Sequence, residues 1–308
     1  MRVRHIKPML ATLVDKPFDA DGWLFEVKWD GFRAIAEVEN DRVEIYSRNL
    51  LSFNKRFSPI IKSLQGHKLK AVLDGEIVIL DSRGKSRFEL LQHYQQTGKG
   101  NLVYYVFDLL FLNGKDLRSQ PLLERKKLLK KILPRNALIK YSEHVLDHGK
   151  KLYEKAKKQT WEGIMAKDYQ SPYRAGKRTK EWQKIKNRPQ QEVVIGGFTK
   201  PSGSRKKFGA LVMGVYERGK LLYIGHAGTG FDEQTLNLVY NKLKPLIQKN
   251  PAFKNPPETR GETTWVKPKL VGEVAFEEWT EDGHMRQPAF LGLRPDKKAS
   301  EVRKELPK

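Results

Sequence analysis

The stretch that decides the fold and the chemistry runs from residue 26 to residue 33 and reads Glu26-Val27-Lys28-Trp29-Asp30-Gly31-Phe32-Arg33. A lysine ends a strand-like run there, and a turn made by Asp30 and Gly31 follows it. An amine placed at the mouth of a pocket beside other cations has a lowered pKa, so its lone pair can attack phosphorus. A solvated lysine in an ordinary strand-end turn would look the same. This pattern therefore predicts a nucleophile only together with further motifs.

Apolar runs and helical patterns alternate around this stretch, which predicts a mixed α/β domain. Strands are expected at residues 24–28, 34–38, 43–47, 71–80, 102–112, 163–167 and 182–186. Helices are expected at residues 51–64, 88–95, 122–131 and 146–159. The pair Asn40-Asp41 predicts a hairpin between two of these strands.

A polar stretch with a proline, Asn187-Arg188-Pro189-Gln190-Gln191, is expected to link two domains, at residues 1–188 and 189–308. The pattern after it is mainly β, with strands at residues 192–198, 210–217, 220–227 and 271–279 and a helix at residues 232–248. About five strands with one helix fit a small OB-fold barrel. The predicted class is therefore α+β, and residues 295–308 are expected to form a charged tail or frayed helix.

The composition excludes several classes of protein. The sequence contains no cysteine, which rules out disulfides, thiolate zinc sites and cysteine nucleophiles. A mean hydropathy of -0.63 and the lack of an apolar run near ~20 residues predict no membrane span. The apolar stretch at residues 9–14 is too short for a signal peptide, so a cytoplasmic protein is expected.

Positive charge is the strongest signal in the composition. Lys and Arg number 59 against 36 Asp and Glu, which gives a formal net charge of +23. This excess favours a nucleic acid partner, because cations placed near phosphates release condensed counterions. A solvated basic surface and an anionic membrane are alternatives, and the membrane is the weaker one because no basic amphipathic helix with a clean apolar face stands out.

Two acidic and two basic residues supply the charges that phosphoryl transfer needs. Glu76 and Glu162 each lie beside a glycine in a strand-like context, and their oxygens suit Mg²⁺. Lys184 and Lys186 alternate with Ile185, so in a strand they face the same side, where a phosphate would separate their charges. The positive charges of these two lysines would also favour the neutral form of Lys28 beside them. Each residue taken alone would be an ordinary surface side chain.

The order of the motifs is more specific than any one of them. After the lysine segment come Ser47-Arg48-Asn49, Asp74-Gly75-Glu76, Val106-Phe107-Asp108, Glu162-Gly163-Ile164-Met165-Ala166-Lys167, Trp182-Gln183-Lys184-Ile185-Lys186 and Arg294-Pro295-Asp296-Lys297. In this order the chain resembles the covalent nucleotidyltransferases, which comprise ATP-dependent DNA ligases, RNA ligases and mRNA capping enzymes. The resemblance covers almost the whole chain.

The resemblance implies that Lys28 attacks ATP and carries AMP. Lys184 and Lys186 would grip the α-phosphate and assist the leaving group, and Asp30 is placed with them among the catalytic residues. The other implied nucleotide contacts are Glu26 on the adenine amino group, Phe107 and Met165 on the two faces of the base, Arg33 and Arg48 on ribose and phosphate, and Arg178 as a further basic position.

The resemblance also implies a metal site and a lid. Glu76 would contact the ribose or a Mg²⁺ or Mn²⁺ ion, and Glu162 would bind that ion. Arg294 and Lys297 would move over the nucleotide with the OB domain and orient the β and γ phosphates. A charged tail would account for the same residues without any such role.

Within these families the amino-acid sequence resembles the ligase domain of bacterial ligase D, the end-joining enzyme that works with Ku. Pro8-Met9-Leu10-Ala11 and residues 272–279 and 292–297 carry this resemblance. It implies a monomer that seals 3′-OH/5′-phosphate nicks in nicked or broken duplex DNA, during repair or end joining, at the nucleoid. The chain has no room for polymerase or nuclease domains, so a stand-alone minimal ligase or a ligase module is expected.

Two other interpretations stay open. An RNA ligase or a GTP-using capping enzyme would share the lysine chemistry, although the OB domain and the closing Arg294–Lys297 segment favour a DNA ligase. A non-catalytic basic scaffold that binds DNA would account for the charge but not for the ordered acids and lysines.

Overall fold

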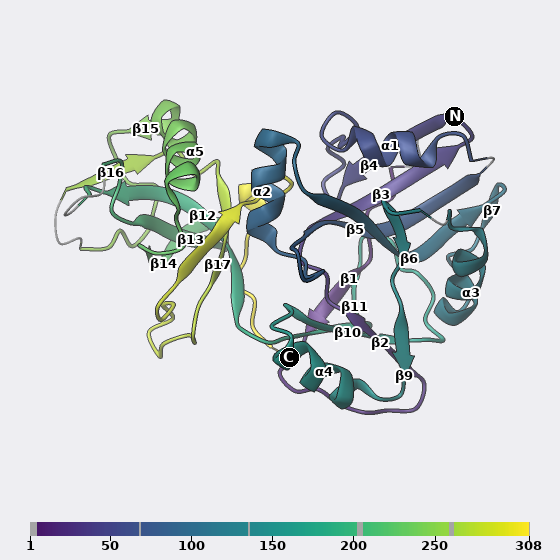
Figure 1. Cartoon of the computed structure of the whole chain (residues 1–308). Coiled ribbons are helices and arrows are strands. Elements are labelled where there is room, and N and C mark those ends of the chain that lie inside the picture. The colour runs from purple at the N-terminus through teal and green to yellow at the C-terminus, as the bar shows by residue number, and fades with distance from the viewer. Residues whose placement is uncertain (1–4, 68, 135, 202–205, 259–261, 308) are drawn as a thin grey trace. The chain divides into compact units, whose positions relative to one another are not determined.

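The computed structural model describes residues 5–67, 69–134, 136–201, 206–258 and 262–307. The chain divides into two compact units, one of Met1–Asn187 with Pro307–Lys308 and one of Arg188–Leu306. Figure 1 labels most of the elements of both. No helix within the described ranges is long and apolar enough to cross a bilayer.

The first unit is built on two sheets. The long sheet has the strand order β4-β3-β5-β6-β7, with β8 beside β6, and the lysine sheet has the order β1-β11-β10-β2-β9. The strands of the long sheet are β3 (Phe32–Glu39), β4 (Arg42–Ser47), β5 (Lys70–Leu80), β6 (Asn101–Leu112), β7 (Lys115–Asp116) and β8 (Ile139–Tyr141). Those of the lysine sheet are β1 (Leu10–Leu13), β2 (Trp23–Val27), β9 (His144–Leu146), β10 (Gly163–Asp168) and β11 (Arg178–Lys186).

Strand alternation gives each sheet two different faces. One face of the lysine sheet carries Phe25, Ile164 and Ile185, which pack against Tyr153 of α4 (Gly149–Lys158) in one buried cluster. The helices α1 (Ser58–Leu64) and α2 (Phe88–Thr97) cover the outer face of the long sheet in the same way. Helix α3 (Leu122–Ile132) lies along β6, with Leu129 in the cluster of the outer face and Leu122 in a cluster on the inner side.

A further buried cluster joins the two sheets through their inner faces. Leu24 and Trp182 of the lysine sheet share it with Ile35, Val72 and Phe107 of the long sheet. Glu26 of the lysine sheet and Asp74 of the long sheet are buried on these inner faces too, so charged groups lie between the sheets.

The helix expected at residues 51–64 is shorter than predicted. It begins at Ser58, with Pro59 in its first turn, where the missing N–H costs no hydrogen bond. The helix expected from residue 146 begins at Gly149, because Leu146 belongs to the short strand β9. The expected strands of this unit and the hairpin at Asn40 are confirmed.

The second unit is mainly β. Its sheet runs β14-β13-β12-β16-β15, with β17 pairing to β12 and β18 to β17. The strands are β12 (Gln190–Thr199), β13 (Leu211–Glu217), β14 (Lys220–Ala227), β15 (Ile247–Gln248), β16 (Thr263–Val266), β17 (Val271–Ala275) and β18 (Ala289–Leu293). Helix α5 (Glu233–Leu243) is capped by the Asp232 carboxylate, which accepts a hydrogen bond from Thr235 N at 2.7 Å.

Three sequence expectations for this unit are wrong. The predicted linker is too long, because Gln190 and Gln191 already belong to β12. The helix predicted to reach residue 248 ends at Leu243, with a short 3₁₀ turn containing Pro245 after it. The strand predicted to reach residue 279 ends at Ala275.

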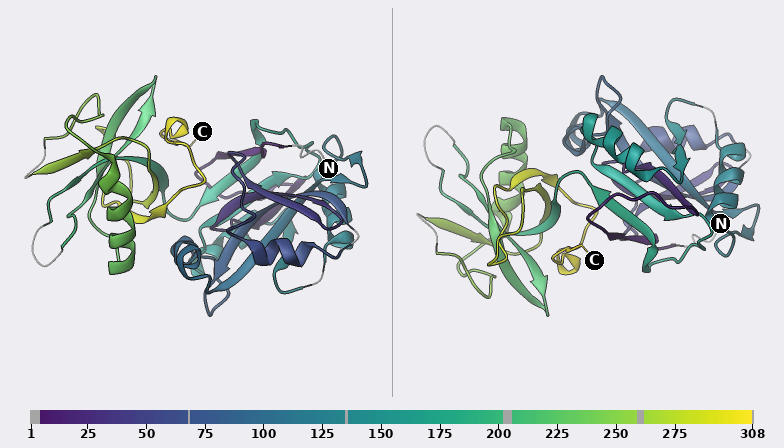
Figure 2. Two further views of the ribbon diagram at one scale, coloured as in Figure 1. Left: turned by 90° about the horizontal axis from the view of Figure 1, so that it is seen from above. Right: turned by 90° about the horizontal axis from the view of Figure 1, so that it is seen from below.

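The C-terminal segment, yellow in Figure 2, is not the free tail that its charge suggested. Val302 is buried in the core of the second unit, and its carbonyl accepts a hydrogen bond from Tyr216 N at 2.9 Å. Gln191 binds the segment with both ends of its amide, through Arg303 O at 2.9 Å and Glu305 N at 2.9 Å. One buried valine within a charged run gives no periodic signal, so the sequence alone suggested a tail.

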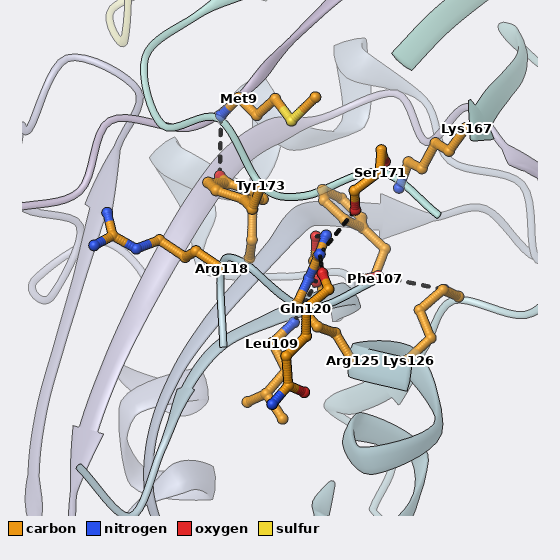
Figure 3. A network of polar contacts seen from close by, with 12 residues as sticks. Met9, Phe107, Leu109, Arg118, Gln120, Arg125, Lys126, Lys167, Ser171 and Tyr173 are labelled. Atoms are coloured by element: carbon orange, nitrogen blue, oxygen red, sulfur yellow. Dashed lines mark hydrogen bonds and ion pairs between the residues drawn. The ribbon is translucent and has the colours of Figure 1, made fainter. Parts of the chain in front are cut away.

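A buried ion pair fixes α3 to the long sheet, as Figure 3 shows around Arg125. The Arg125 guanidinium donates to both carboxylate oxygens of Asp108, each at 2.8 Å, and both side chains have no exposed surface. It also donates to the carbonyls of Gln120 and Ser171. The bidentate geometry and the two further acceptors satisfy a charge that would be costly to bury alone.

Replacing Asp108 with Asn should lower the free energy of unfolding by about 3–5 kcal/mol, because it leaves the Arg125 charge buried without a counter-charge. The matched control is Glu143→Gln, which breaks an exposed pair with Lys130 and should cost under about 1 kcal/mol. Urea denaturation followed by circular dichroism measures both. Equal losses in the two variants would contradict this account.

Candidate active site

The register of the lysine sheet brings predicted site residues together on its inner face. Met165 on β10 lies opposite Glu26 on β2 and opposite Lys184 on β11. Residues that are directly opposite in neighbouring strands share a face of the sheet. Three segments far apart along the chain therefore meet in one row.

The next row on the same face contains the predicted nucleophile. Lys28 continues the ladder past the end of β2, because its N–H donates to Gly163 O at 3.0 Å, and Gly163 pairs with Lys186. Gly163 has a φ of +152°, and a Cβ there would lie 2.0 Å from the Ile185 carbonyl oxygen. Only glycine fits at position 163, between Lys28 and Lys186 of the neighbouring strands.

The turn after Lys28 also needs its glycine. A Cβ on Gly31 would lie 2.1 Å from the carbonyl oxygen of Ile77 in β5. The Asp30 carboxylate accepts a hydrogen bond from Phe88 N, the first residue of α2, at 3.3 Å, and Asp30 N donates to Ser86 Oγ at 3.1 Å. Asp30 thus holds the turn in place, whatever further part it takes in catalysis.

Lys28 forms an ion pair with Glu162, the residue just before β10. Burial acts to lower the pKa of Lys28, but the charge and hydrogen bond of Glu162 outweigh burial, and Asp30 and Glu76 act in the same direction. The pKa of Lys28 is therefore raised. The expectation that neighbouring lysines keep this amine neutral is wrong, because the carboxylates around it dominate.

The carboxylates near Lys28 fit a magnesium-type ion. Glu76 lies on the inner face of the long sheet, in register with Arg33, and both Glu76 and Glu162 act on the charge of Lys28. Within the described ranges no group of three or more acidic or histidine side chains forms a metal cage. Mg²⁺ commonly takes one or two carboxylates and fills its other positions with water and phosphate oxygens, which matches this donor set.

Glu26 lies between two buried lysines. Its Oε1 accepts from Lys126 Nζ and its Oε2 accepts from Lys167 Nζ at 2.5 Å, and the three side chains are at most 2% exposed. Burial acts to raise the pKa of Glu26, but the two lysines outweigh it and lower the pKa. Burial lowers the pKa of Lys167 to about 8, against the attraction of Glu26. The carboxylate is therefore ionised and held by both oxygens.

Phe107 is buried beside this group. Lys167 Nζ lies 4.1 Å and Arg33 Cζ lies 4.6 Å from the centre of the Phe107 ring, and the ring meets Trp182 edge to face. Cations at these distances are attracted by the ring electrons. The stacking of Phe107 on adenine stays a prediction.

The three arginines predicted to contact the nucleotide differ in their surroundings. The Arg33 guanidinium binds both carboxylate oxygens of Asp74, each at 2.6 Å, and Tyr173 donates to the same carboxylate at 2.6 Å. Arg48 is half-buried in the turn after β4. Arg178 is exposed at the start of β11, at the opposite end from Lys186, and donates to the carbonyl of Ala11.

The predicted lid residues lie in the second unit. Arg294 binds the carboxylates of Glu273 and Asp296, and burial, which acts to lower its pKa, is outweighed by these two charges. Lys297 lies 2.6 Å from a carboxylate oxygen of Glu192. Both cations are thus held by acids of the same unit, and their roles toward the leaving phosphates stay predictions.

Sequence reasoning missed Lys126 and Tyr173, and it quoted Asp74 within a motif without giving it a role. Lys126 stands in a run of lysines, and only helical spacing with Leu122 and Leu129, four residues before and three after it, places it on the buried face of α3. Figure 3 shows Tyr173 directed at Met9 N, a bond of 3.0 Å across 164 residues. No local pattern reveals contacts of that kind.

His144 lies in β9 opposite Glu26. Burial, with help from the charge of Lys126, lowers its pKa to about 4, well below the ordinary 6.5. The uncharged ring is thus favoured in the folded chain. The stability that this gives is fully present above pH 6.5 and is lost as the pH falls toward about 4.

Replacing His144 with Asn should therefore reduce the fall in thermal stability between pH 6.5 and about pH 5, where few carboxylates titrate. Melting curves of both proteins at several pH values provide the measurement. The parent chain should lose more of its melting temperature over this interval than the variant. Identical slopes would show that His144 does not have a lowered pKa.

Comparison with known proteins extends over both units. The ATP dependent DNA ligase domain family matches residues 8–186, and the ATP dependent DNA ligase C terminal region matches residues 204–297. The multifunctional non-homologous end joining protein LigD of Pseudomonas aeruginosa is 37% identical over 98% of this chain and 37% of its own length. LigD of Mycolicibacterium smegmatis is 36% identical, over 98% of this chain and 40% of its own length. The chain thus spans about two fifths of the length of these curated relatives.

Solved structures agree with this match. The mycobacterial DNA ligase D complexed with ATP and MES is 35% identical, with a TM-score of 0.74, and the match covers 99% of this chain and all of that one. The ligase domain of M. tuberculosis LigD, with the same identity and coverage, has a TM-score of 0.57. These matches confirm the predicted nucleotidyltransferase and OB folds. The chain belongs to the family of ATP-dependent DNA ligases.

Proposed function

We propose that this chain seals 3′-OH/5′-phosphate breaks in duplex DNA through a covalent lysyl-AMP intermediate. The observation that carries the proposal is the Lys28–Glu162 pair, on a sheet face that also bears Lys184 and Lys186. A primary amine, a carboxylate and further cations on one face are the groups that nucleophilic attack on a phosphate ester requires.

In the first step the nitrogen of Lys28 attacks the α-phosphorus of ATP. A nitrogen–phosphorus bond forms, the bond from phosphorus to the bridging oxygen breaks, and pyrophosphate takes the electron pair. The amine must first give up its extra proton and its contact with Glu162. Lys184 and Lys186 offset the charge that develops on the phosphate oxygens.

The next two steps move AMP and close the break. An oxygen of the DNA 5′-phosphate attacks the AMP phosphorus, and the Lys28 nitrogen leaves. The 3′-hydroxyl then loses its proton and attacks the activated 5′-phosphate, and AMP departs with the electron pair. The transfer of AMP gives the 5′-phosphate a good leaving group, which the final attack of the 3′-hydroxyl then displaces.

Glu76 and Glu162 would hold the metal ion, Mg²⁺ or Mn²⁺. Such an ion, when bound, lowers the cost of negative charge on the reacting phosphates. The nucleotide would be held by the residues that the family resemblance assigned to it. These are Glu26, Arg33, Arg48, Phe107, Met165 and Arg178.

The partners follow from charge and from the named relatives. A net charge of +23 favours a nucleic acid, and the relatives are named end-joining proteins, so we infer nicked or broken duplex DNA as substrate. We further infer a role in end joining beside Ku, as a monomer at the nucleoid, with domains at residues 1–188 and 189–308.

Replacing Lys28 with Ala should abolish labelling of the protein by α-labelled ATP, because the variant has no amine at the position where the Lys28 ammonium meets the Glu162 carboxylate. The control is Lys127→Ala on α3, whose ammonium pairs with Glu124 at the surface. A chase with nicked DNA should remove the label from the parent chain, whereas nicked RNA should not. Labelling of the Lys28 variant, or adduct formation with GTP alone, would overturn the proposal.

Replacing Glu76 with Gln should raise the Mg²⁺ concentration for half-maximal adduct formation at least about tenfold, because one of two charged ligands is lost. Glu124→Gln, on the surface of α3, should leave it unchanged. Metal titration of the initial labelling rate, after treatment with a chelator, measures the effect. An unchanged midpoint would remove Glu76 from the metal site.

A further inference from the structure

Lys126 is a buried lysine with every donor in use. Its side chain has no exposed surface, and its ammonium donates to Glu26 Oε1, to Ser142 O at 3.1 Å and to Phe107 O at 3.3 Å. An ammonium has three N–H groups, so this lysine is fully satisfied. Figure 3 shows it reaching from α3 toward the backbone of Phe107.

Stability alone does not account for this arrangement. Two lysines surround one carboxylate, so the buried group carries a net positive charge. Replacing a buried ion pair by well-packed apolar residues is often neutral or stabilising. The contacts of Lys126 instead do something an apolar side chain would not, since they fix the position of a carboxylate and of a main-chain segment at once.

The carboxylate of Glu26 is restricted by these contacts to one chemical role. Lys126 holds Oε1 and Lys167 holds Oε2, so the group is ionised and does not rotate. An ionised carboxylate only accepts hydrogen bonds, and each oxygen keeps a further lone pair. A ligand edge that meets Glu26 must therefore present an N–H group and not a carbonyl oxygen.

Lys126 also ties together the parts of the site around Lys28. Glu26 is two residues from Lys28 on the same face of the sheet. The backbone of Phe107 is bound by the Lys126 ammonium, and the side chain of Ser142 accepts from Trp29 Nε1 at 3.0 Å. One side chain thus sets the carboxylate, the aromatic residue and the segment that adjoins the nucleophile.

We propose that Lys126 is a positioning residue that holds Glu26 and Phe107 so that the pocket accepts adenine and rejects guanine. Adenine presents an amino group at position 6, which donates to a carboxylate, whereas guanine presents a carbonyl oxygen there, which the carboxylate repels. This inference rests on the proposed reaction of Lys28 with ATP.

The test is Lys126→Met, which keeps the length of the side chain and removes its charge and donors. Initial rates of adduct formation with α-labelled ATP and GTP give the ratio of their kcat/KM values. The ratio should fall at least about tenfold, through a higher KM for ATP with kcat little changed, because a contact to the base is the same before and during attack. Lys127→Met, its exposed neighbour, is the matched control and should leave the ratio unchanged.

A double-mutant cycle with Glu26→Gln separates positioning from general damage. The amide that Glu26→Gln introduces would offer either an acceptor or a donor to the base, so this change alone should lower the ratio. If Lys126 acts through Glu26, then Glu26→Gln/Lys126→Met should discriminate no worse than Glu26→Gln. Lys126→Met alone leaves Glu26 balanced by Lys167. If thermal melting shows that Lys126→Met does not fold, Lys126→Gln is measured in its place and should also lower the ratio, because its amide carries no charge to hold the carboxylate.

Equal losses with ATP and GTP in Lys126→Met, or a further tenfold loss of discrimination in the double variant, would overturn the inference and leave Lys126 a structural residue. These outcomes are distinct from failure of the proposed function, in which the parent chain itself forms no adduct with ATP. An adduct in the parent with an unchanged ATP:GTP ratio in Lys126→Met defeats only the role of Lys126.

Discussion

Charged side chains held between the two sheets of the first unit must find partners of opposite sign, and this constraint orders the whole site. A charge removed from water is costly unless a counter-charge and hydrogen bonds replace the solvent. The pairs are Lys28 with Glu162, Arg33 with Asp74, Arg125 with Asp108, and Glu26 with Lys126 and Lys167. Each pair joins residues from different elements, so the charges that serve the chemistry also fix how strands and helix α3 pack.

Strand alternation decides which of these charges meet. Residues 24, 26 and 28 face the interior between the sheets, while Phe25 packs under α4 on the other side. A shift of one residue in the pairing of β2 with β10 would turn Lys28 away from Glu162 and bury it against apolar side chains. The close approach at Gly163 opposes such a shift, because no side chain fits between the neighbouring strands there.

Much of this could be predicted from the sequence, because the informative residues are local. Lys28, Lys184 and Lys186 stand in short strand patterns whose faces can be counted, and the glycines mark where backbones approach closely. The ion-pair partners of these charged residues could not be predicted, because Glu162 is 134 residues from Lys28 and Lys126 is 100 residues from Glu26. The error about the pKa of Lys28 has a related origin. The sequence assigned Glu162 to a metal ion, and nothing in it indicated that this carboxylate contacts the ammonium directly and outweighs burial.

In the proposed reaction, phosphate binding would be an exchange of anions. The Lys28 ammonium and the Arg33 guanidinium each lie against a carboxylate, of Glu162 and Asp74. A phosphate must therefore offer more than the carboxylate that it replaces, and its additional charged oxygens allow this. Lys28 carries one further condition, since attack on phosphorus uses the lone pair that the proton occupies. Glu162 favours that proton, so the same ion pair that places the amine in the site also restrains its reactivity until the contact is exchanged.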